Sequence, residues 1–406
     1  MVTPIAIETY ASRRARFGML HAHRFLFRVG LSIANVFAWI FVFQYFYFWT
    51  LSIPGALVIT VVMYCVAQIV TIILAPVSAS HLRRGIKHSL VFGAVVAGAA
   101  FIYLGATLSD TLNGEPIGWG IVVFAILLGA YRALYWVPYQ LGATSDGARS
   151  RLPIVYELVI AFMPAFAGAT MVSFPEAPQS LLYGASVFCL LSLFPILNFE
   201  DLSERFEWGY FETFNQFYAI KHRRLLAASF TQGIQGATLF LLWPIAVYLI
   251  VGSDYQTLGA IVSATLVVSV IWRGYYRRLA QRAGIEHSTS VNVAFSVFGW
   301  MLRFFAGTPV AVFLADSYSH ISSPRPAYII DALTFEQASD SGSFIDEYTV
   351  LKEIGLALGR IGICVLFALL LGIFSIQIAF AFALILTAVA SGASVIMERN
   401  AGISVL

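Results

Sequence analysis

An acid and an imidazole lie one helical turn apart in an apolar part of the sequence. Asp316 and His320 are four residues apart, and the surrounding letters "SYSHISSPRP" add several serines. Side chains at this spacing lie on one face of a helix. In an apolar setting, a carboxylate and an imidazole can exchange protons near neutral pH. We expect the pair to couple protons or bind substrate; the alternative is that Asp316 only neutralises an arginine such as Arg360.

Two similar loops, "GATSDGARS" and "EQASDSGSF", each follow an arginine and precede a glutamate. Arg132 and Arg325 come 14 and 15 residues before the loop aspartate, and Glu157 and Glu353 come 11 and 13 residues after it. Residues equally far from a hairpin loop lie at similar depth in a membrane. The spacing therefore predicts two ion pairs with a structural or gating role, Arg132 with Glu157 and Arg325 with Glu353. For Arg132 the alternative is a cation that meets an anionic substrate in a cavity.

Three amides add hydrogen-bonding groups to the apolar segments. Asn35 lies in the first segment, and Gln232 and Gln235 lie in the seventh. Amides suit polar ligands, and they also bond neighbouring helices, so both roles stay open. The three cysteines fall in different segments, which predicts neither a disulfide framework nor a metal site. No cofactor-binding or enzyme motif is found, so we expect no cofactor and no enzymatic activity.

The elements that carry these residues are membrane spans. The 406 residues are 59% hydrophobic and 11% charged, with a mean hydropathy of +0.82, whereas soluble domains are about 25% charged. Apolar runs recur near the length of about 20 residues that a spanning helix needs. They predict twelve spans, at 25–49, 53–77, 89–108, 117–140, 152–174, 179–198, 225–251, 256–275, 290–305, 308–334, 346–371 and 373–396.

The positive charges predict the orientation. Eighteen of the 24 Lys and Arg residues fall in segments that a cytoplasmic N-terminus places inside, and the outside loops "TLNGEPI", "FPEAPQS" and "GSDYQ" hold none. By the positive-inside rule, both termini are expected in the cytoplasm. The net charge of +3 is explained by this topology, so no nucleic-acid partner is expected.

The longest inside connection divides the chain. We expect a cytoplasmic segment at 1–24, a six-helix bundle at 25–198, a linker at 199–224, a second bundle at 225–396 and a tail at 397–406. Within the linker, aromatic residues at spacings of four and three predict an amphipathic helix in "ERFEWGYFETFNQFYAI". The predicted fold is thus all-α, with twelve transmembrane helices in two pseudo-symmetric halves.

Twelve spans, inside termini and a six-plus-six division resemble the major facilitator superfamily over essentially the whole chain. The family's loop motif between spans two and three is partly kept in "HLRRGIKH", with Leu82 where the family has an acid, and "LAQRAG" is its degenerate counterpart. "AFMPAFAGA" in span five resembles a weakened antiporter motif, which close helix packing explains equally well. "LYWVPYQ" and "DEYTVLKE" are similar to an unassigned prokaryotic branch of the superfamily.

The resemblance implies two bundles that rock around a central site, with spans 1, 4, 7 and 10 lining the cavity. We therefore expect a secondary active transporter of a small molecule in a prokaryotic cytoplasmic membrane, monomeric, surrounded by lipids and coupled to protons if Asp316 and His320 act as above. The alternative is a lipid-handling or non-transporting member of the superfamily, serving as a flippase or a membrane scaffold.

Overall fold

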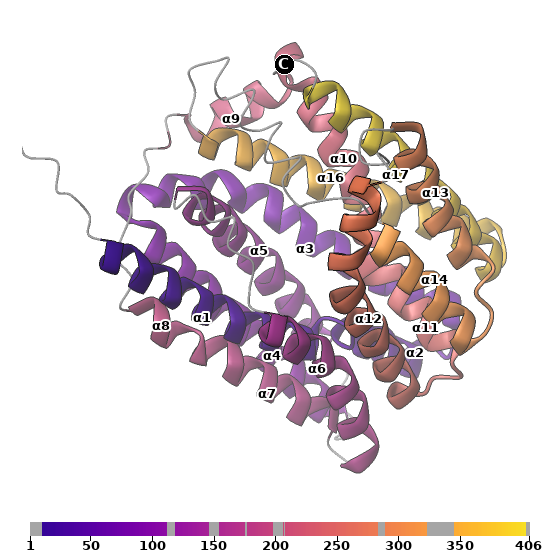
Figure 1. Ribbon diagram of the computed structural model, residues 1–406. Coiled ribbons are helices and arrows are strands. Elements are labelled where there is room, and N and C mark those ends of the chain that lie inside the picture. Colours follow the sequence, from indigo (N-terminus) through magenta and orange to yellow (C-terminus); the bar gives the residue numbers. More distant parts are fainter. Residues whose placement is uncertain are drawn as a thin grey trace, which may run out of the picture.

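The computed structural model describes residues 10–111, 118–145, 154–174, 177–197, 206, 208–282, 289–322 and 345–402. Every regular element in these ranges is a helix, which confirms the predicted all-α class (Figure 1). Ten helical segments of the described chain are long and apolar enough to cross a membrane, so the chain is a multi-pass membrane protein. Two shorter helices, α13 and α14, occupy the ninth and tenth span positions.

The N-terminal half contains the first six spans. Its first and sixth spans are each built from two consecutive helices. The elements in chain order are α1 (Tyr10–Ala34), α2 (Ala38–Thr50), α3 (Ile53–His81), the 3₁₀ turn η1 (Leu82–Arg84), α4 (Ile86–Thr111), α5 (Trp119–Ser145), α6 (Ile154–Ser173), α7 (Ala177–Leu191) and α8 (Leu193–Leu197).

The linker and the C-terminal half follow. The seventh span combines two α-helices with a π-helical segment between them. The elements are α9 (Tyr210–Phe217), the 3₁₀ turn η2 (Ile220–His222), α10 (Arg223–Ala237), the π segment η3 (Thr238–Leu242), α11 (Trp243–Ile250), α12 (Tyr255–Arg282), α13 (Thr289–Phe304), α14 (Pro309–Ser322), α16 (Ile345–Ile373) and α17 (Ile376–Gly402).

The described helices pair in the same way in both halves. α1 packs on α6 and α7, as α10 packs on α16 and α17. α5 packs on α3 and α4, as α14 packs on α12 and α13, and α4 meets α7 as α13 meets α17. These equivalent pairings are the expected six-plus-six repeat. The predicted domain boundaries stay predictions; α1 already begins at Tyr10, and α17 runs on to Gly402.

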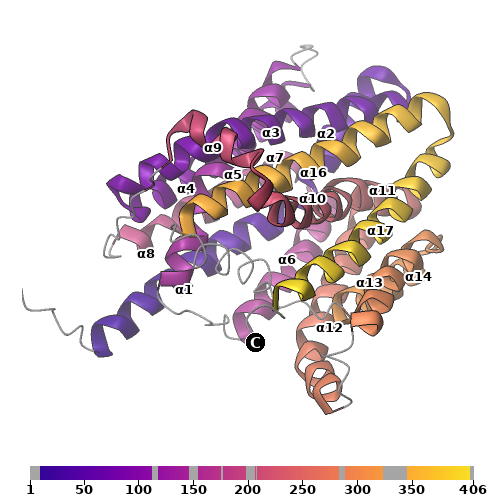
Figure 2. The same cartoon turned by 90° about the horizontal axis from the view of Figure 1, so that it is seen from above.

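The two halves meet most extensively along two helix pairs, α3 with α16 and α6 with α12. In Figures 1 and 2, α16 lies between α3 of the N-terminal half and α10 of its own half. The α6–α12 contact depends on small residues: a Cβ atom on Gly168 would lie 2.5 Å from the carbonyl oxygen of Tyr255, and one on Gly259 would lie 2.3 Å from that of Pro164. Close packing thus accounts for the small residues of "AFMPAFAGA".

In each half, a tight turn joins the first span to the second. In the N-terminal half, Leu51 follows α2 with a positive φ of 49°, and Ser52 caps α3 by accepting a hydrogen bond of 3.4 Å from Gly55 N–H. Between the seventh and eighth spans, Asp254 caps α12 by accepting hydrogen bonds of 3.0 Å from the N–H groups of Gln256 and Thr257. Side-chain caps of this kind satisfy the donors that a helix start leaves free.

The loop between spans two and three contacts the linker. Leu82, where the family has an acid, is fully buried among apolar side chains. Arg83 donates a hydrogen bond of 2.8 Å to the carbonyl oxygen of Phe206 in the linker. Gly85 has φ of 115°, a conformation that suits glycine. The loop therefore lacks the family's acidic group and anchors the connection between the halves.

Candidate functional site

Asp316 is held by two residues of its own half. Its Oδ1 atom accepts a hydrogen bond of 2.7 Å from Arg303 Nε, and both of its oxygens lie 3.0 Å from Trp243 Nε1. These residues come from α14, α13 and α11. The arginine also lies over two indole rings, 5.6 Å from the centre of Trp243 and 4.2 Å from that of Trp300. Such cation–π contacts and the ion pair stabilise a buried guanidinium.

The arginine that pairs with Asp316 differs from the example that the sequence suggested. The partner is Arg303 on the adjacent helix α13, and Arg360 lies elsewhere, on α16. In the described part of the chain, the hydrogen bonds of Asp316 run to Trp243 and Arg303 and not to His320. His320 is half-buried and has contacts of its own. A helical spacing of four thus placed the two groups on one helix face without bringing them into a bonded pair.

A second polar group lies where the two halves meet. Arg360 Nη1 of α16 donates a hydrogen bond of 3.1 Å to Gln68 Oε1 of α3. Arg132 of α5, Glu353 of α16 and Tyr64 of α3 lie within electrostatic reach of Arg360. We call these five residues, Tyr64, Gln68, Arg132, Glu353 and Arg360, the interhalf cluster. All are buried except Arg132, which is half-buried.

Several donors of the interhalf cluster have no hydrogen-bond partner among the described residues. They are Tyr64 Oη, Gln68 Nε2, Arg132 Nε and Arg360 Nε. Buried polar groups in native proteins are nearly always hydrogen-bonded, so four unsatisfied donors in one place need an explanation. The usual explanation is a bound ligand or water that accepts hydrogen bonds from these donors. The cluster is therefore a candidate binding site for groups that carry acceptor atoms.

The predicted Arg132–Glu157 ion pair is absent from the described contacts. Glu157 lies within electrostatic reach of Arg28 on α1, whereas Arg132 reaches Arg360 and Tyr64. The reason is that the two helices of this hairpin pack mainly on other helices: α5 packs on α3 and α4, and α6 packs on α12 and α1. The other predicted pair stays a prediction, because Arg325 lies outside the described residues. Glu353 lies within electrostatic reach of Arg360.

The three amides lie in different surroundings. Gln235 Nε2 contacts the carbonyl oxygen of Thr231 and Ser394 Oγ of α17, both at 3.3 Å, so its amide bonds a neighbouring helix. Gln232 is half-buried on α10 and also has contacts. Asn35 is exposed and begins the three-residue break between α1 and α2.

The first and seventh spans, which occupy equivalent positions in the two halves, are both irregular near their middle, the first at this break and the seventh at the π segment η3. Such irregularities are frequent at functional sites.

A hydrogen-bonded triad closes one end of the contact between the halves. Gln44 Nε2 of α2 donates to Tyr248 Oη of α11, and Tyr255 Oη of α12 donates to Gln44 Oε1. The Tyr248 and Tyr255 rings also contact each other, with centroids 5.1 Å apart. No pattern in the sequence predicted this triad, although Gln44 is the one amide in the aromatic run "WIFVFQYFYFW".

Two cysteines from opposite halves also meet. Cys65 of α3 and Cys364 of α16 have their thiols within hydrogen-bonding reach of each other. Each residue follows a member of the interhalf cluster: Cys65 is next to Tyr64, and Cys364 is one turn beyond Arg360. Their sequence positions gave no signal of this contact, because each lies alone in its span.

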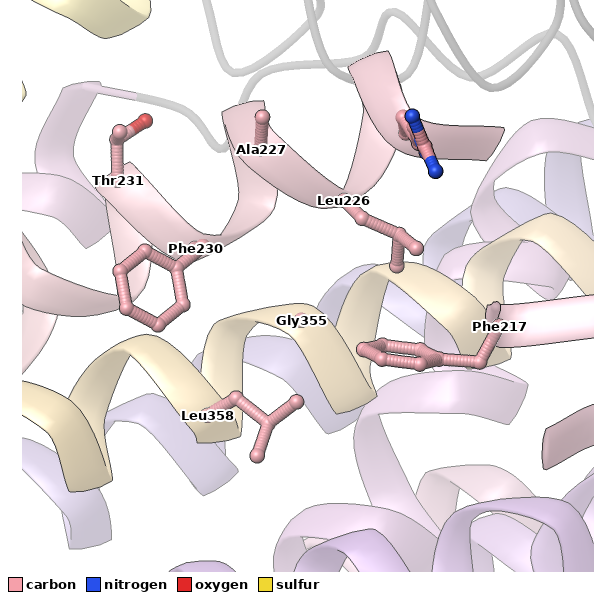
Figure 3. A pocket seen from close by; sticks show the side chains of 8 residues that line it. Phe217, Leu226, Ala227, Phe230, Thr231, Gly355 and Leu358 are labelled. Carbon is pink, nitrogen blue, oxygen red and sulfur yellow. The ribbon is translucent and has the colours of Figure 1, made fainter. Parts of the chain in front are cut away.

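An open hollow of about 330 Å³ lies elsewhere, beside the linker helix. Figure 3 shows it between Phe217 of α9, Leu226 and Phe230 of α10, and Leu358 of α16. Arg223 also lines it. Its lining is almost wholly apolar, and it shares no lining residue with the interhalf cluster. A groove of this character suits an acyl chain or an apolar side chain better than a polar solute.

No protein-family model matches the chain, and no curated protein matches it in sequence. Solved structures do match its shape. A bacterial homologue of the iron transporter ferroportin in an inward-facing state superposes with a TM-score of 0.62 at 14% identity, covering 97% of this chain and 99% of that chain. The chain has the fold of the major facilitator superfamily.

Other structures with this fold agree. The nucleoside transporter NupG gives a TM-score of 0.62 at 12% identity over 93% of this chain and 99% of that chain. The ferroportin homologue in its outward-facing state gives 0.59 at 15% identity over 96% and 99%. Identities this low carry the fold and leave the substrate to be argued from the residues of this chain.

Proposed function

We propose that this chain is a secondary transporter that moves a small molecule across a membrane by alternating access, with its binding site in the interhalf cluster. The observation that supports this most is that buried polar side chains of both halves meet at the α3–α16 contact. Ionisable groups within a membrane are costly and usually functional. In this fold type, the substrate site lies between the repeats, near the middle of the bilayer.

In this proposal, the Gln44–Tyr248–Tyr255 triad is the gate for such a cycle. It joins helices of both halves beside the turns that end in Leu51 and Asp254, the end of the molecule that the charge distribution assigns to the outside. Its bonds would have to break for the halves to part at that end. In the proposed state, the outer side of the transporter is therefore closed. We further propose that both termini lie in the cytoplasm of a prokaryotic cell and that the protein acts as a monomer.

Proton coupling through Asp316 is part of the proposal in a revised form. Because Arg303 already neutralises the carboxylate, proton uptake by Asp316 would require release of that arginine. His320, one turn away, remains a candidate proton donor. Purified Asp316→Asn protein in proteoliposomes with an imposed pH gradient tests this: flux that depends on the gradient as in the wild type removes Asp316 as the coupling acid.

The transport function itself is tested by counterflow in proteoliposomes with a panel of sugars, amino acids, organic anions and nucleosides. We expect one class to exchange, and Arg360→Gln to abolish the exchange. The lipid-handling alternative is favoured only by the apolar groove of Figure 3. It predicts movement of labelled phospholipid between leaflets with no solute exchange, and that result would replace the transport proposal.

A further inference from the structure

Arg132 and Arg360 come from opposite halves and lie within electrostatic reach of each other. Arg360 is only 6% exposed, so water screens its charge little. Two permanent cations at this depth repel each other and are costly to keep out of water. A group of negative charge placed between them would lower both costs at once.

The charges of the interhalf cluster do not cancel within the described residues. Glu353 is the carboxylate within electrostatic reach of Arg360, and it is 4% exposed on the same helix. It also has other contacts. Two guanidinium groups and one carboxylate leave an excess of one positive charge. This sign favours an anionic ligand and disfavours a metal cation or an organic amine.

The hydrogen-bonding capacity of the cluster has the same bias. Its unpartnered atoms are N–H or O–H donors: Arg132 Nε, Arg360 Nε, Gln68 Nε2 and Tyr64 Oη. A buried donor without a partner costs about 1–3 kcal/mol. Carboxylate and phosphate groups present several acceptor oxygens together, and the planar fork of arginine matches their geometry. A single water satisfies few of these donors and leaves the charge unbalanced.

We infer that the interhalf cluster binds the carboxylate or phosphate group of a small soluble anion. This names the substrate class of the proposed transport site and to that extent rests on the proposed function; the anion site itself rests on the cluster. Because Arg132 belongs to one half and Arg360 to the other, the bound anion bridges the halves. Its arrival removes a repulsion across their contact, which links ligand binding to closure of the halves.

The first test uses wild-type protein in detergent, with thermal denaturation followed at constant ionic strength. We expect inorganic phosphate or succinate to raise the melting temperature with a saturable dependence on concentration, because a ligand of the folded state stabilises it. Chloride, adenosine and glucose at matched concentrations should produce no such shift. Stabilisation by adenosine or glucose alone, or by no probe, would overturn the inference.

The second test assigns the effect to the cluster. We expect Arg132→Gln and Arg360→Gln to weaken phosphate or succinate binding by about 10- to 100-fold, the range for a lost charge-assisted hydrogen bond. Arg278→Gln is the matched control, because Arg278 is exposed near the end of α12. Arg360→Lys keeps the charge and loses the fork, so it should bind with intermediate affinity even if Arg360→Gln fails to fold. Equal binding by Arg278→Gln and the folded cluster variants would contradict the assignment.

The third test separates this inference from the transport proposal and from a lipid headgroup as the anion's source. Exchange of phosphate or succinate in proteoliposomes supports both proposals. Stabilisation by these anions without exchange of any solute would support the anion site and contradict the transport proposal. Exchange of neutral solutes alone would support the transport proposal and contradict the anion site. If phosphatidylglycerol vesicles abolish the phosphate or succinate effect and phosphatidylcholine vesicles do not, the ligand is a lipid headgroup and a soluble anion is excluded.

Discussion

Arg360 of α16 donates a hydrogen bond of 3.1 Å to the side-chain oxygen of Gln68 on α3, so one buried contact joins the C-terminal half to the N-terminal half. Gln68 is fully buried, and its own Nε2 donor has no partner in the described chain. The amide therefore serves two purposes in our interpretation: it accepts from one arginine and offers a donor to a ligand. The hydrogen bond from the Arg360 guanidinium fixes the orientation of this amide.

Gln68→Leu should destabilise the protein, because it leaves the buried Arg360 guanidinium without its partner. Loss of a hydrogen bond to a charged group predicts a decrease of about 1.5–3 kcal/mol in the free energy of unfolding. Thermal denaturation of the purified protein measures it. Gln235→Leu is the control, because the two acceptors that its amide bonds, Thr231 O and Ser394 Oγ, carry no charge, and it should cost less. A smaller loss for Gln68→Leu than for Gln235→Leu would contradict the interpretation.

The Asp316–Arg303 ion pair should appear in a double-mutant cycle. Asp316→Asn or Arg303→Gln alone leaves a buried, unpaired group and should cost about 3–5 kcal/mol. The double variant should cost less than the sum of the single variants, by about 1 kcal/mol or more. The parallel cycle of Asp316→Asn with Arg360→Gln should be close to additive, because Asp316 pairs with Arg303 and not with Arg360. The reverse pattern of coupling would show that the ion pair is wrongly assigned.

The sequence predicts where a residue lies along a span better than it predicts which neighbouring helix its side chain meets. Hydropathy predicted the all-α membrane fold correctly, because it depends only on the composition of successive segments along the chain. The partner of Arg132 depends on how α5 is rotated and on which helices it meets, and α5 meets α3 where the hairpin argument assumed α6. The triad of Gln44, Tyr248 and Tyr255 joins residues far apart in the chain, and no local pattern encodes such a contact.

Opening of the proposed outer gate should follow loss of Gln44. We expect Gln44→Leu to lengthen the distance between spin labels placed at Phe48 and Gln256, because both hydrogen bonds of the triad depend on the amide. Both label sites are exposed and flank the triad in opposite halves. Pulsed electron resonance measures the distance distribution. Tyr183→Phe is the control, because Tyr183 is an exposed side chain of α7. An unchanged distribution in Gln44→Leu would show that the triad does not hold the gate.

Loss of the α12 cap should lower stability in a pH-dependent way. Hydrogen bonds from Thr257, its hydroxyl above all, lower the pKa of Asp254 from its ordinary value of 3.8. A lowered folded-state pKa means that the stabilisation is present above the unfolded pKa and disappears as the pH falls through the folded pKa. Asp254→Ala should therefore cost about 0.5–2 kcal/mol at neutral pH. The difference in melting temperature from wild type should shrink below pH 3.8; a constant difference would contradict this account.

The contact between Cys65 and Cys364 offers a direct test of how the halves are placed. Because the two thiols lie within hydrogen-bonding reach, mild oxidation with copper phenanthroline should form a disulfide between α3 and α16. Intact mass would show the loss of two hydrogens, and peptide mapping would identify the pair. Cys189→Ser should leave the reaction unchanged, because Cys189 is buried on α7, whereas Cys364→Ser should abolish it. Because the bond would form beside the interhalf cluster, oxidation should change anion binding and reduction should restore it. Failure of the wild-type thiols to react, while denatured protein forms the bond, would show that α3 and α16 do not meet at these residues.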